Sequence, residues 1–140
     1  MNELILDHDP DSLIHFLHFH GFAYLDQHEK LAQYAHIFKH KRNGSVIGYT
    51  WMYELHDEPF CYNVHMCMDK RFHGQIFNKR LVNQFYSECY NLGAKVLDVG
   101  PAPKHLIELY NRIGFEKIDA ETARLKLPFQ WRNKWDQQKK

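Results

Sequence analysis

The amino-acid sequence predicts an α/β protein of the α+β type, with a mixed but mostly antiparallel central sheet and helices packed against it. Three observations support this prediction: a β-hairpin signal around Asn43, a long amphipathic helical pattern that ends near Asn91, and short strand-like segments after that helix. The predicted order is strand, two helices, hairpin, strand, helix, strand, helix and a closing pair of strands. We therefore expect about six to seven strands flanked by about four helices.

The first segments combine a short strand with two helices. Residues 4–6 are apolar and predict a strand, and the apolar side chains of residues 13–17 fall mainly on one side of a helical projection. Asp11 or Ser12 would open this helix and Gly21 would end it. A weaker helical pattern covers residues 26–34.

A hairpin of residues 36–42 and 45–55 gives the strongest local signal. The intervening Asn43-Gly44 supplies the positive φ angles of a type I′ turn. In its second strand one face should be buried, formed by Ile47, Tyr49, Trp51, Tyr53 and Leu55.

The strand predicted at residues 60–68 places alternate side chains on opposite faces. One face carries Tyr62, Val64, Met66 and Met68, and the other carries Asn63, His65 and Cys67. The remaining elements are predicted as a helix from about residue 74 to 91, a strand at 94–99, a helix at 104–113 and closing strands at 115–120 and 124–129.

Composition limits the classes of function. The 140 residues, 44% of them hydrophobic, suit one domain at residues 1–129, followed by a polar tail at residues 130–140. Eighteen basic and seventeen acidic residues give a net charge of +1, which offers no strong nucleic-acid signal. The chain has no apolar run near the ~20 residues of a membrane span and no secretory signal pattern, so no membrane partner is expected. Three cysteines without a CxxC spacing favour a reducing, cytoplasmic location.

Two further groups of side chains are candidate ligand sites. His15, His18 and His20 do not all share one helical face and lack a companion motif, so no metal site is predicted. Trp131 and Trp135 stand among basic residues and could stack on a nucleic acid, but packing of a Trp against the domain is the favoured interpretation.

Two segments resemble the GNAT superfamily of acyl-CoA-dependent N-acetyltransferases. Residues 68–82, MDKRFHGQIFNKRLV, resemble the strand-to-helix pyrophosphate loop of that family, and residues 109–115, LYNRIGF, resemble its Leu-Tyr-x-x-x-Gly-Phe segment. A helix N-terminus suits a pyrophosphate because its N–H groups are unpaired and carry partial positive charge.

The pyrophosphate loop is degenerate in this chain. Gly74 is kept, but His73 replaces the Arg of the family, and Ile76 and Asn78 replace its next two glycines. Arg71 is a candidate substitute for the missing charge. Before the last helix, Pro103 and Leu106 stand where the family has Asn and Ala. The resemblance nevertheless implies acetyl-CoA as co-substrate, held by Met66, Met68, Phe72, His73, Gly74, Gln75, Ile76, Phe77, Asn78, Lys79 and Tyr110.

The resemblance also implies catalytic roles. Tyr110 would be the general acid that protonates the thiolate leaving group, although its position also suits simple packing on the helix. His65 is the candidate general base, with Glu54 and Tyr62 as rivals. Cys67 is a weaker candidate as nucleophile, because a free cysteine in such a strand usually serves as a small buried apolar side chain.

The favoured function is therefore an acyl-CoA-dependent N-acetyltransferase that transfers an acetyl group to a primary amine of an unknown acceptor. The alternative is a non-catalytic GNAT-fold interaction or assembly protein with weak or no CoA binding, which the loss of glycines favours. The sequence leaves open whether the chain forms a homodimer or binds a protein partner.

Overall fold

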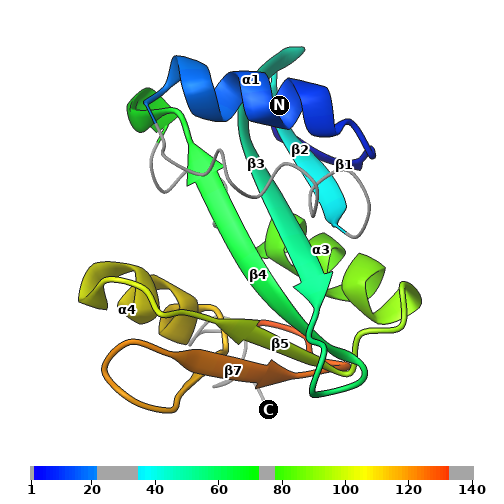
Figure 1. Ribbon diagram of the computed structural model, residues 1–140, viewed down its shortest axis with the longest axis vertical. Helices are drawn as coiled ribbons and strands as arrows, with labels where there is room; N and C mark the ends of the chain where they lie inside the picture. Colours follow the sequence, from blue (N-terminus) through cyan, green and yellow to red (C-terminus); the bar gives the residue numbers. More distant parts are fainter. Residues whose placement is uncertain (1, 22–34, 73–77, 133–140) are drawn as a thin grey trace.

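The computed structural model describes residues 2–21, 35–72 and 78–132 (Figure 1). Its centre is a seven-stranded sheet in the order β1-β2-β3-β4-β5-β7-β6. Among the strand pairings of the described residues only β4–β5 is parallel, so the predicted mixed and mostly antiparallel sheet is confirmed. The strands are β1 (Asn2–Leu6), β2 (His36–Arg42), β3 (Ser45–Glu54), β4 (Cys61–Met68), β5 (Val96–Val99), β6 (Glu116–Lys117) and β7 (Ala123–Lys126).

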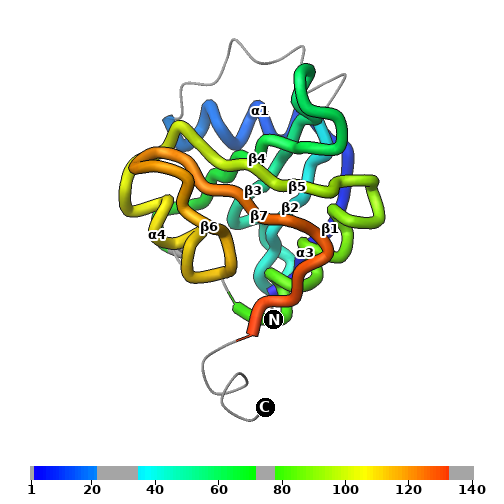
Figure 2. Tube along the Cα trace, turned by 90° about the horizontal axis from the view of Figure 1, so that it is seen from below, coloured from blue at the N-terminus to red at the C-terminus, as the bar shows by residue number. Residues whose placement is uncertain are grey.

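The two faces of the sheet carry different helices. In the described residues the α-helices are α1 (Pro10–Phe19), α3 (Lys79–Asn91) and α4 (Lys104–Arg112), and a short 3₁₀ helix, η2, spans Lys70–Phe72. Figure 2 shows α1 on one side of the sheet and α3 on the other. The helix predicted at residues 26–34 lies outside the described residues. No helix in the described part of the chain has the length and apolar character of a membrane span.

The start of α1 differs from the prediction. The helix is capped by Asp9, with Pro10 in its first turn, rather than by Asp11 or Ser12. The Asp9 carboxylate accepts hydrogen bonds from the Ser12 backbone N–H at 3.1 Å and from the Ser12 hydroxyl at 2.7 Å. These bonds, together with Lys39, lower the pKa of Asp9 to about 2. Pro10 fits the first helical position because its missing N–H is not needed there.

The hairpin prediction is confirmed, since Asn43 and Gly44 have φ angles of 51° and 85°. The face of β3 predicted to be buried is buried at Ile47, Tyr49 and Trp51, and the opposite face of this strand is buried as well. Trp51 is buried beneath α1, and Met52, its neighbour on the opposite face, is buried on the α3 side. Both faces of this central strand are covered because α1 and α3 pack on opposite sides of the sheet.

The core consists mainly of two clusters separated by the sheet. The α1-side cluster contains Leu13, Leu17, Ala35, Ile37, Tyr49, Trp51 and Cys67. The larger α3-side cluster joins β2–β5 and β7 to α3 and α4, and includes Phe38, Met52, Val64, Leu81, Val82, Tyr86, Leu97, Ile107, Tyr110, Phe115 and Leu125. The alternation predicted for β4 is confirmed, since Val64 belongs to the α3-side cluster and Cys67 to the α1-side cluster.

Several element ends also differ from the prediction. Within the described residues α3 begins at Lys79 rather than near residue 74, and the Asn78 side chain caps it by accepting from the Leu81 N–H at 2.9 Å. The closing strands are shorter than expected because the chain turns between them, with the Ile118 N–H donating to the Thr122 carbonyl at 3.0 Å.

The C-terminal segment packs against α3 as far as it is described. The backbone N–H of Trp131 donates to Asn83 Oδ1 at 2.7 Å, and Asn83 Nδ2 donates to the Trp131 carbonyl at 3.0 Å. Trp131 also packs against the α3-side cluster. This confirms the expectation that a Trp folds back on the domain; Trp135 lies outside the described residues.

Candidate active site

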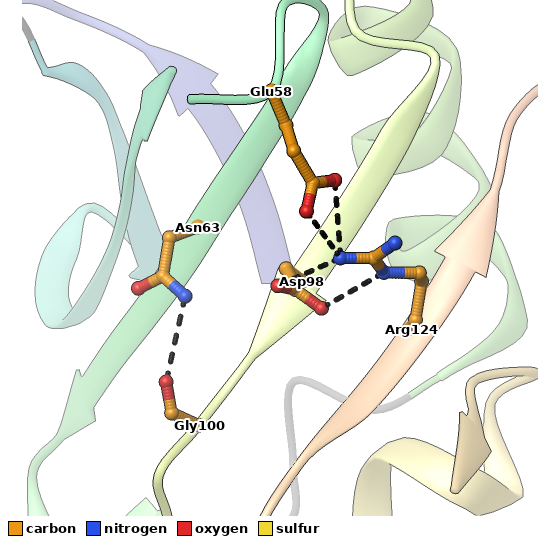
Figure 3. Close-up of polar contacts among 5 residues, drawn as sticks. All are labelled: Glu58, Asn63, Asp98, Gly100 and Arg124. Atoms are coloured by element: carbon orange, nitrogen blue, oxygen red, sulfur yellow. Dashed lines mark hydrogen bonds and ion pairs between the residues drawn. The ribbon is translucent and has the colours of Figure 1, made fainter. Parts of the chain in front are cut away.

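The candidate site lies where the parallel strands β4 and β5 separate. Their described ladder pairs residues 61–63 of β4 with residues 96–98 of β5, and ends at Asn63 and Asp98. Beyond this level β4 continues to Met68, while the chain leaves β5 at Gly100. Asn63 Nδ2 donates to the Gly100 carbonyl at 3.5 Å where the two strands part (Figure 3).

An ion-pair network lies at the end where β4 and β5 are still paired. Arg124 on β7 lies opposite Asp98 on β5, and its Nε donates to Asp98 Oδ1 at 3.2 Å. Its Nη2 donates to Asp98 Oδ2 and to Glu58 Oε1, both at 3.3 Å. Figure 3 shows Glu58, from the β3–β4 turn, and Asp98 converging on this guanidinium. The network therefore joins β5, β7 and the β3–β4 turn.

A cavity of about 40 Å³ lies on the α3 side of the separating strand. Val64 and Met66 line it from β4, beyond the last residue paired with β5, and Tyr110 lines it from α4. Its other lining residues are His40, Thr50, Leu81, Val82, Phe85, Tyr86, Ile113 and Phe115. The cavity is therefore mostly apolar, with few polar groups.

Tyr110 is placed in this cavity by α4 and the turn that follows it. Its ring packs edge-on against Phe115 at 5.1 Å between ring centroids, and 7% of the residue is exposed. Burial raises the pKa of Tyr110 above that of an ordinary tyrosine. The phenol is therefore protonated at neutral pH and has a proton to donate.

His65 lies on the opposite face of β4 from Tyr110. Its ring stacks on Trp51 at 5.6 Å and meets the edge of Tyr53 at 5.8 Å, on the side of the sheet that α1 covers. The two predicted catalytic residues thus flank β4 from its two sides. Of the predicted cofactor contacts on β4, Met66 lines the cavity, whereas Met68 is buried against Ile47.

The rivals of His65 are less suited to accept a proton or attack a carbonyl. Tyr62 faces the α3 side, and burial raises its pKa to about 12. Burial likewise raises the pKa of the Cys67 thiol to about 12, which leaves it protonated at neutral pH. Glu54 is exposed at the end of β3.

The N-terminus of α3 suits an anionic group. Its first turn contains no acidic residue and carries Lys79 and Arg80. The Asn78 side chain caps the Leu81 N–H, and the Asn78 carbonyl accepts from Val82. Phe72 ends η2, and His73, Gly74, Gln75, Ile76 and Phe77 lie outside the described residues.

The positive charge of Arg71, the candidate substitute for the missing arginine of the loop, is paired with the carboxylate of Asp69. Its Nη2 donates to Asp69 Oδ2 at 2.7 Å, and its Nε donates to both carboxylate oxygens at 3.2 Å. These bonds lower the pKa of Asp69 to about 2, so the aspartate stays ionised and offsets the arginine charge. Lys79 and Arg80 add two basic side chains in the first turn of α3, and Arg80 Nη2 donates to the Asn2 carbonyl.

The structure adds two cavity residues that the sequence did not indicate. His40 Nε2 lies 2.7 Å from Thr50 Oγ1, and the residues are 6% and 5% exposed. Burial lowers the pKa of His40 to about 4, so the imidazole is neutral at pH 7. No sequence signal identifies this site, because His40 stands between Lys39 and Lys41 in a strand and resembles a solvated residue.

Comparison with known proteins gives a family match and a fold match. The model of the acetyltransferase (GNAT) domain matches residues 5–131. A comparison with curated protein sequences gave no match.

Three solved structures illustrate the fold match. A GNAT-family acetyltransferase from Staphylococcus aureus Mu50 is 15% identical with a TM-score of 0.65, covering 91% of this chain and 99% of that one. A Bacillus subtilis acetyltransferase in complex with CoA is 16% identical with a TM-score of 0.65, covering 90% and 97%. The spermidine/spermine N-acetyltransferase of Vibrio cholerae is 14% identical with a TM-score of 0.65, covering 90% and 95%. With a family match over nearly its whole length, this chain belongs to the acetyltransferase (GNAT) domain family.

Proposed function

We propose that the protein transfers an acetyl group from acetyl-CoA to a primary amine of an acceptor, with Tyr110 as general acid and His65 as general base. The observation that carries this proposal is the separation of β4 from β5, with Tyr110 on one face of β4 and His65 on the other. An acyl transfer needs a proton acceptor for the incoming amine and a proton donor for the leaving sulfur, and the two faces supply one each.

The residues present fit a CoA thioester. Lys79, Arg80 and the N-terminus of α3 would hold the diphosphate, because two basic side chains and backbone N–H groups lie together in a first turn that itself contains no acidic residue. Met66 and Tyr110 would lie beside the thioester, which supplies an activated acyl group when bound. The predicted contacts in residues 72–77 remain part of this proposal.

In this proposal the acyl group passes directly from the sulfur of the thioester to the nitrogen of the acceptor. The acceptor nitrogen forms a bond to the acyl carbon, the carbon–sulfur bond breaks, and its electron pair stays with sulfur. His65 takes a proton from the nitrogen, directly or through water. The Tyr110 phenol gives a proton to sulfur. Afterwards Tyr110 regains a proton from solvent and His65 releases its proton to solvent. Neither residue needs an oxidant or a second cofactor.

The stacking of His65 suits the role of base. Trp51 and Tyr53 restrict the ring to one orientation, so little rotational freedom is lost when an amine binds. The proposed acceptor group is a primary amine.

A cytoplasmic location is supported by the three cysteines, all of which are free and buried.

The decisive experiment has two stages. Calorimetric titration with acetyl-CoA should give saturable binding. Release of free thiol should then appear when acetyl-CoA is incubated with a panel of polyamines, aminoglycosides, amino acids and peptides. Binding without thiol release from any acceptor would remove the catalytic assignment. Absence of any heat or thermal shift at millimolar acetyl-CoA would instead favour a non-catalytic interaction protein.

A further inference from the structure

The backbone of Tyr110 is part of the turn that ends α4. Its carbonyl accepts hydrogen bonds from the N–H groups of Ile113 and Phe115, at 3.2 and 3.0 Å. Gly114, with a φ of 114°, donates its N–H to the Asn111 carbonyl at 3.3 Å. A helix end with these bonds and a glycine of positive φ is a Schellman motif. The geometry of this turn therefore sets the point from which the Tyr110 side chain extends.

A side chain of α3 reaches the same turn. Tyr86 is 1% exposed, and its hydroxyl donates to the Ile113 carbonyl at 2.6 Å. Ile113 is the C-cap residue of α4, and carbonyls at a helix end have no partner within the helix. The bond from Tyr86 therefore ties the end of α4 to α3, across 27 positions of the sequence.

The aromatic rings of these residues are also in contact. The Phe115 ring packs edge-on against the Tyr110 ring at 5.1 Å between centroids, and its centroid lies 6.2 Å from that of Tyr86. All three residues line the cavity that Met66 lines from β4. Burial, and to a smaller degree the nearby Tyr110, raises the pKa of Tyr86, so its phenol keeps its proton at neutral pH.

The hydroxyl of Tyr86 is committed to the backbone. A phenol has a single O–H donor, and that of Tyr86 is used by the Ile113 carbonyl, so it has no second proton to give to sulfur. Its effect on the proposed reaction must pass through the position of Tyr110. That position matters because a general acid has to lie within hydrogen-bond reach of the atom it protonates, and a misplacement of about 1 Å costs about 100-fold in rate.

We propose that Tyr86 is a positioning residue for the general acid: by holding the Ile113 carbonyl, it fixes the turn that ends α4 and thereby the direction of the Tyr110 phenol. This inference rests on the role of Tyr110 in the proposed function. It assigns to α3 a part in the proton transfer, in addition to the diphosphate site proposed at its N-terminus.

Hydrogen exchange of the protein without ligand is the first test. Tyr86→Phe keeps the ring and removes only the hydroxyl. We expect the amides of Ile113 and Phe115 to exchange about tenfold faster relative to amides in the middle of α3. Tyr90→Phe, one turn further along α3 at an exposed position, is the matched control and should leave this ratio unchanged. A turn that accelerates no more than α3 does would overturn the proposal.

A kinetic cycle is the second test, with an acceptor found in the panel of amines. Tyr86→Phe should lower kcat about tenfold and change the Kd of acetyl-CoA less than about twofold. In the Tyr110→Phe background the same substitution should lower kcat less than about twofold, because the phenol on which it acts is absent. A tenfold loss in both backgrounds would show that Tyr86 acts independently of Tyr110, and would overturn the proposal.

A second variant covers the case in which Tyr86→Phe does not fold. Asn111 is exposed, and its Nδ2 donates to the Phe115 carbonyl of the same turn at 2.8 Å. Asn111→Ala should also accelerate exchange of the turn and lower kcat, and its effect on kcat should likewise vanish in the Tyr110→Phe background.

The outcomes separate this inference from the proposed function. A loss of kcat in Tyr110→Phe, without coupling between residues 86 and 110, would overturn the positioning role and leave the acetyl transfer standing. An unchanged kcat in Tyr110→Phe, or the absence of thiol release from every acceptor, would overturn the general acid and the positioning role together.

Discussion

Gly100 passes so close to Glu121 that a Cβ on residue 100 would collide with the Glu121 carbonyl oxygen. That carbonyl also accepts a hydrogen bond from the Ala102 N–H at 2.9 Å. Gly100 has a φ of 115°, which side chains rarely adopt. The turn that ends β5, and with it the opening between β4 and β5, therefore depends on a glycine at this position.

We expect Gly100→Ala to lower the free energy of unfolding by about 3 to 4 kcal/mol, because steric overlap adds to backbone strain. Gly93→Ala provides a matched control, since Gly93 has a φ of 102° and no described atom lies within 4 Å of the position that an added Cβ would occupy. It should lose only the strain cost of about 1 to 2 kcal/mol. Urea unfolding of both variants measures the difference, and equal losses would show that Glu121 yields to the added methyl group.

The contacts of Arg124 should differ in strength. Asp98 is paired through two donors and its side chain is 22% exposed, whereas the Glu58 side chain is 49% exposed. We expect a double-mutant cycle to give a coupling of about 1 kcal/mol for Arg124 with Asp98 and about 0.3 kcal/mol for Arg124 with Glu58. Added salt should reduce both couplings, since the guanidinium is about one-third exposed. A larger coupling to Glu58 would contradict the ranking by burial.

His40 should make stability fall as the solution is acidified. Above about pH 6.5 the imidazole is neutral in both states and has no effect. Between pH 6.5 and its folded pKa of about 4, the unfolded chain binds a proton that the folded chain does not, so stability is lost as pH falls through this window. The full loss is about 3 kcal/mol, from a difference of about 2.5 pH units.

Urea unfolding at several pH values between 7 and 4 measures this effect. Burial lowers the pKa of His36 as well, so the comparison that isolates His40 is wild type against His40→Phe. The carboxylates of Asp9 and Asp69 have pKa values of about 2 and contribute below the window rather than within it. Parallel curves for the two proteins would show that His40 titrates normally in the folded state.

Tyr110→Phe should slow acyl transfer while leaving binding of acetyl-CoA nearly unchanged. The ring still fills the cavity, but the proton donor for the departing sulfur is removed, so we expect kcat to fall by about 100-fold and the Kd to change less than about twofold. Tyr90→Phe, at an exposed position on α3, is the control and should match wild type in both quantities. An unchanged kcat for Tyr110→Phe would assign the proton to another donor.

Much of the architecture follows from local sequence patterns. Asn43-Gly44 specifies the hairpin because few other pairs tolerate two positive φ angles in succession. The alternation in residues 62–68 correctly separates the α3 side of β4 from the α1 side, since successive side chains of a strand must point to opposite faces. Tyr110 stands out in the sequence through the resemblance of residues 109–115 to a family segment.

The ends of elements are harder to predict because they depend on capping contacts and turns. Asp9 rather than Ser12 caps α1 because its carboxylate reaches both the backbone and the side chain of Ser12. Likewise, the burial of both faces of β3 needs two helices that lie far from it in the sequence, so alternation within the strand does not reveal it.

Patterns along single segments were enough to predict the hairpin turn, the order of the described strands and the resemblance to the family, because each of these depends on the spacing of nearby residues. Three features emerge only when the chain is folded: His65 and Tyr110 flank β4 from opposite sides, Asp69 offsets the charge of Arg71, and His40 is a buried neutral group beside Tyr110. Burial and pairing set the protonation of a side chain, and both depend on strands and helices that meet through folding rather than through proximity in the sequence.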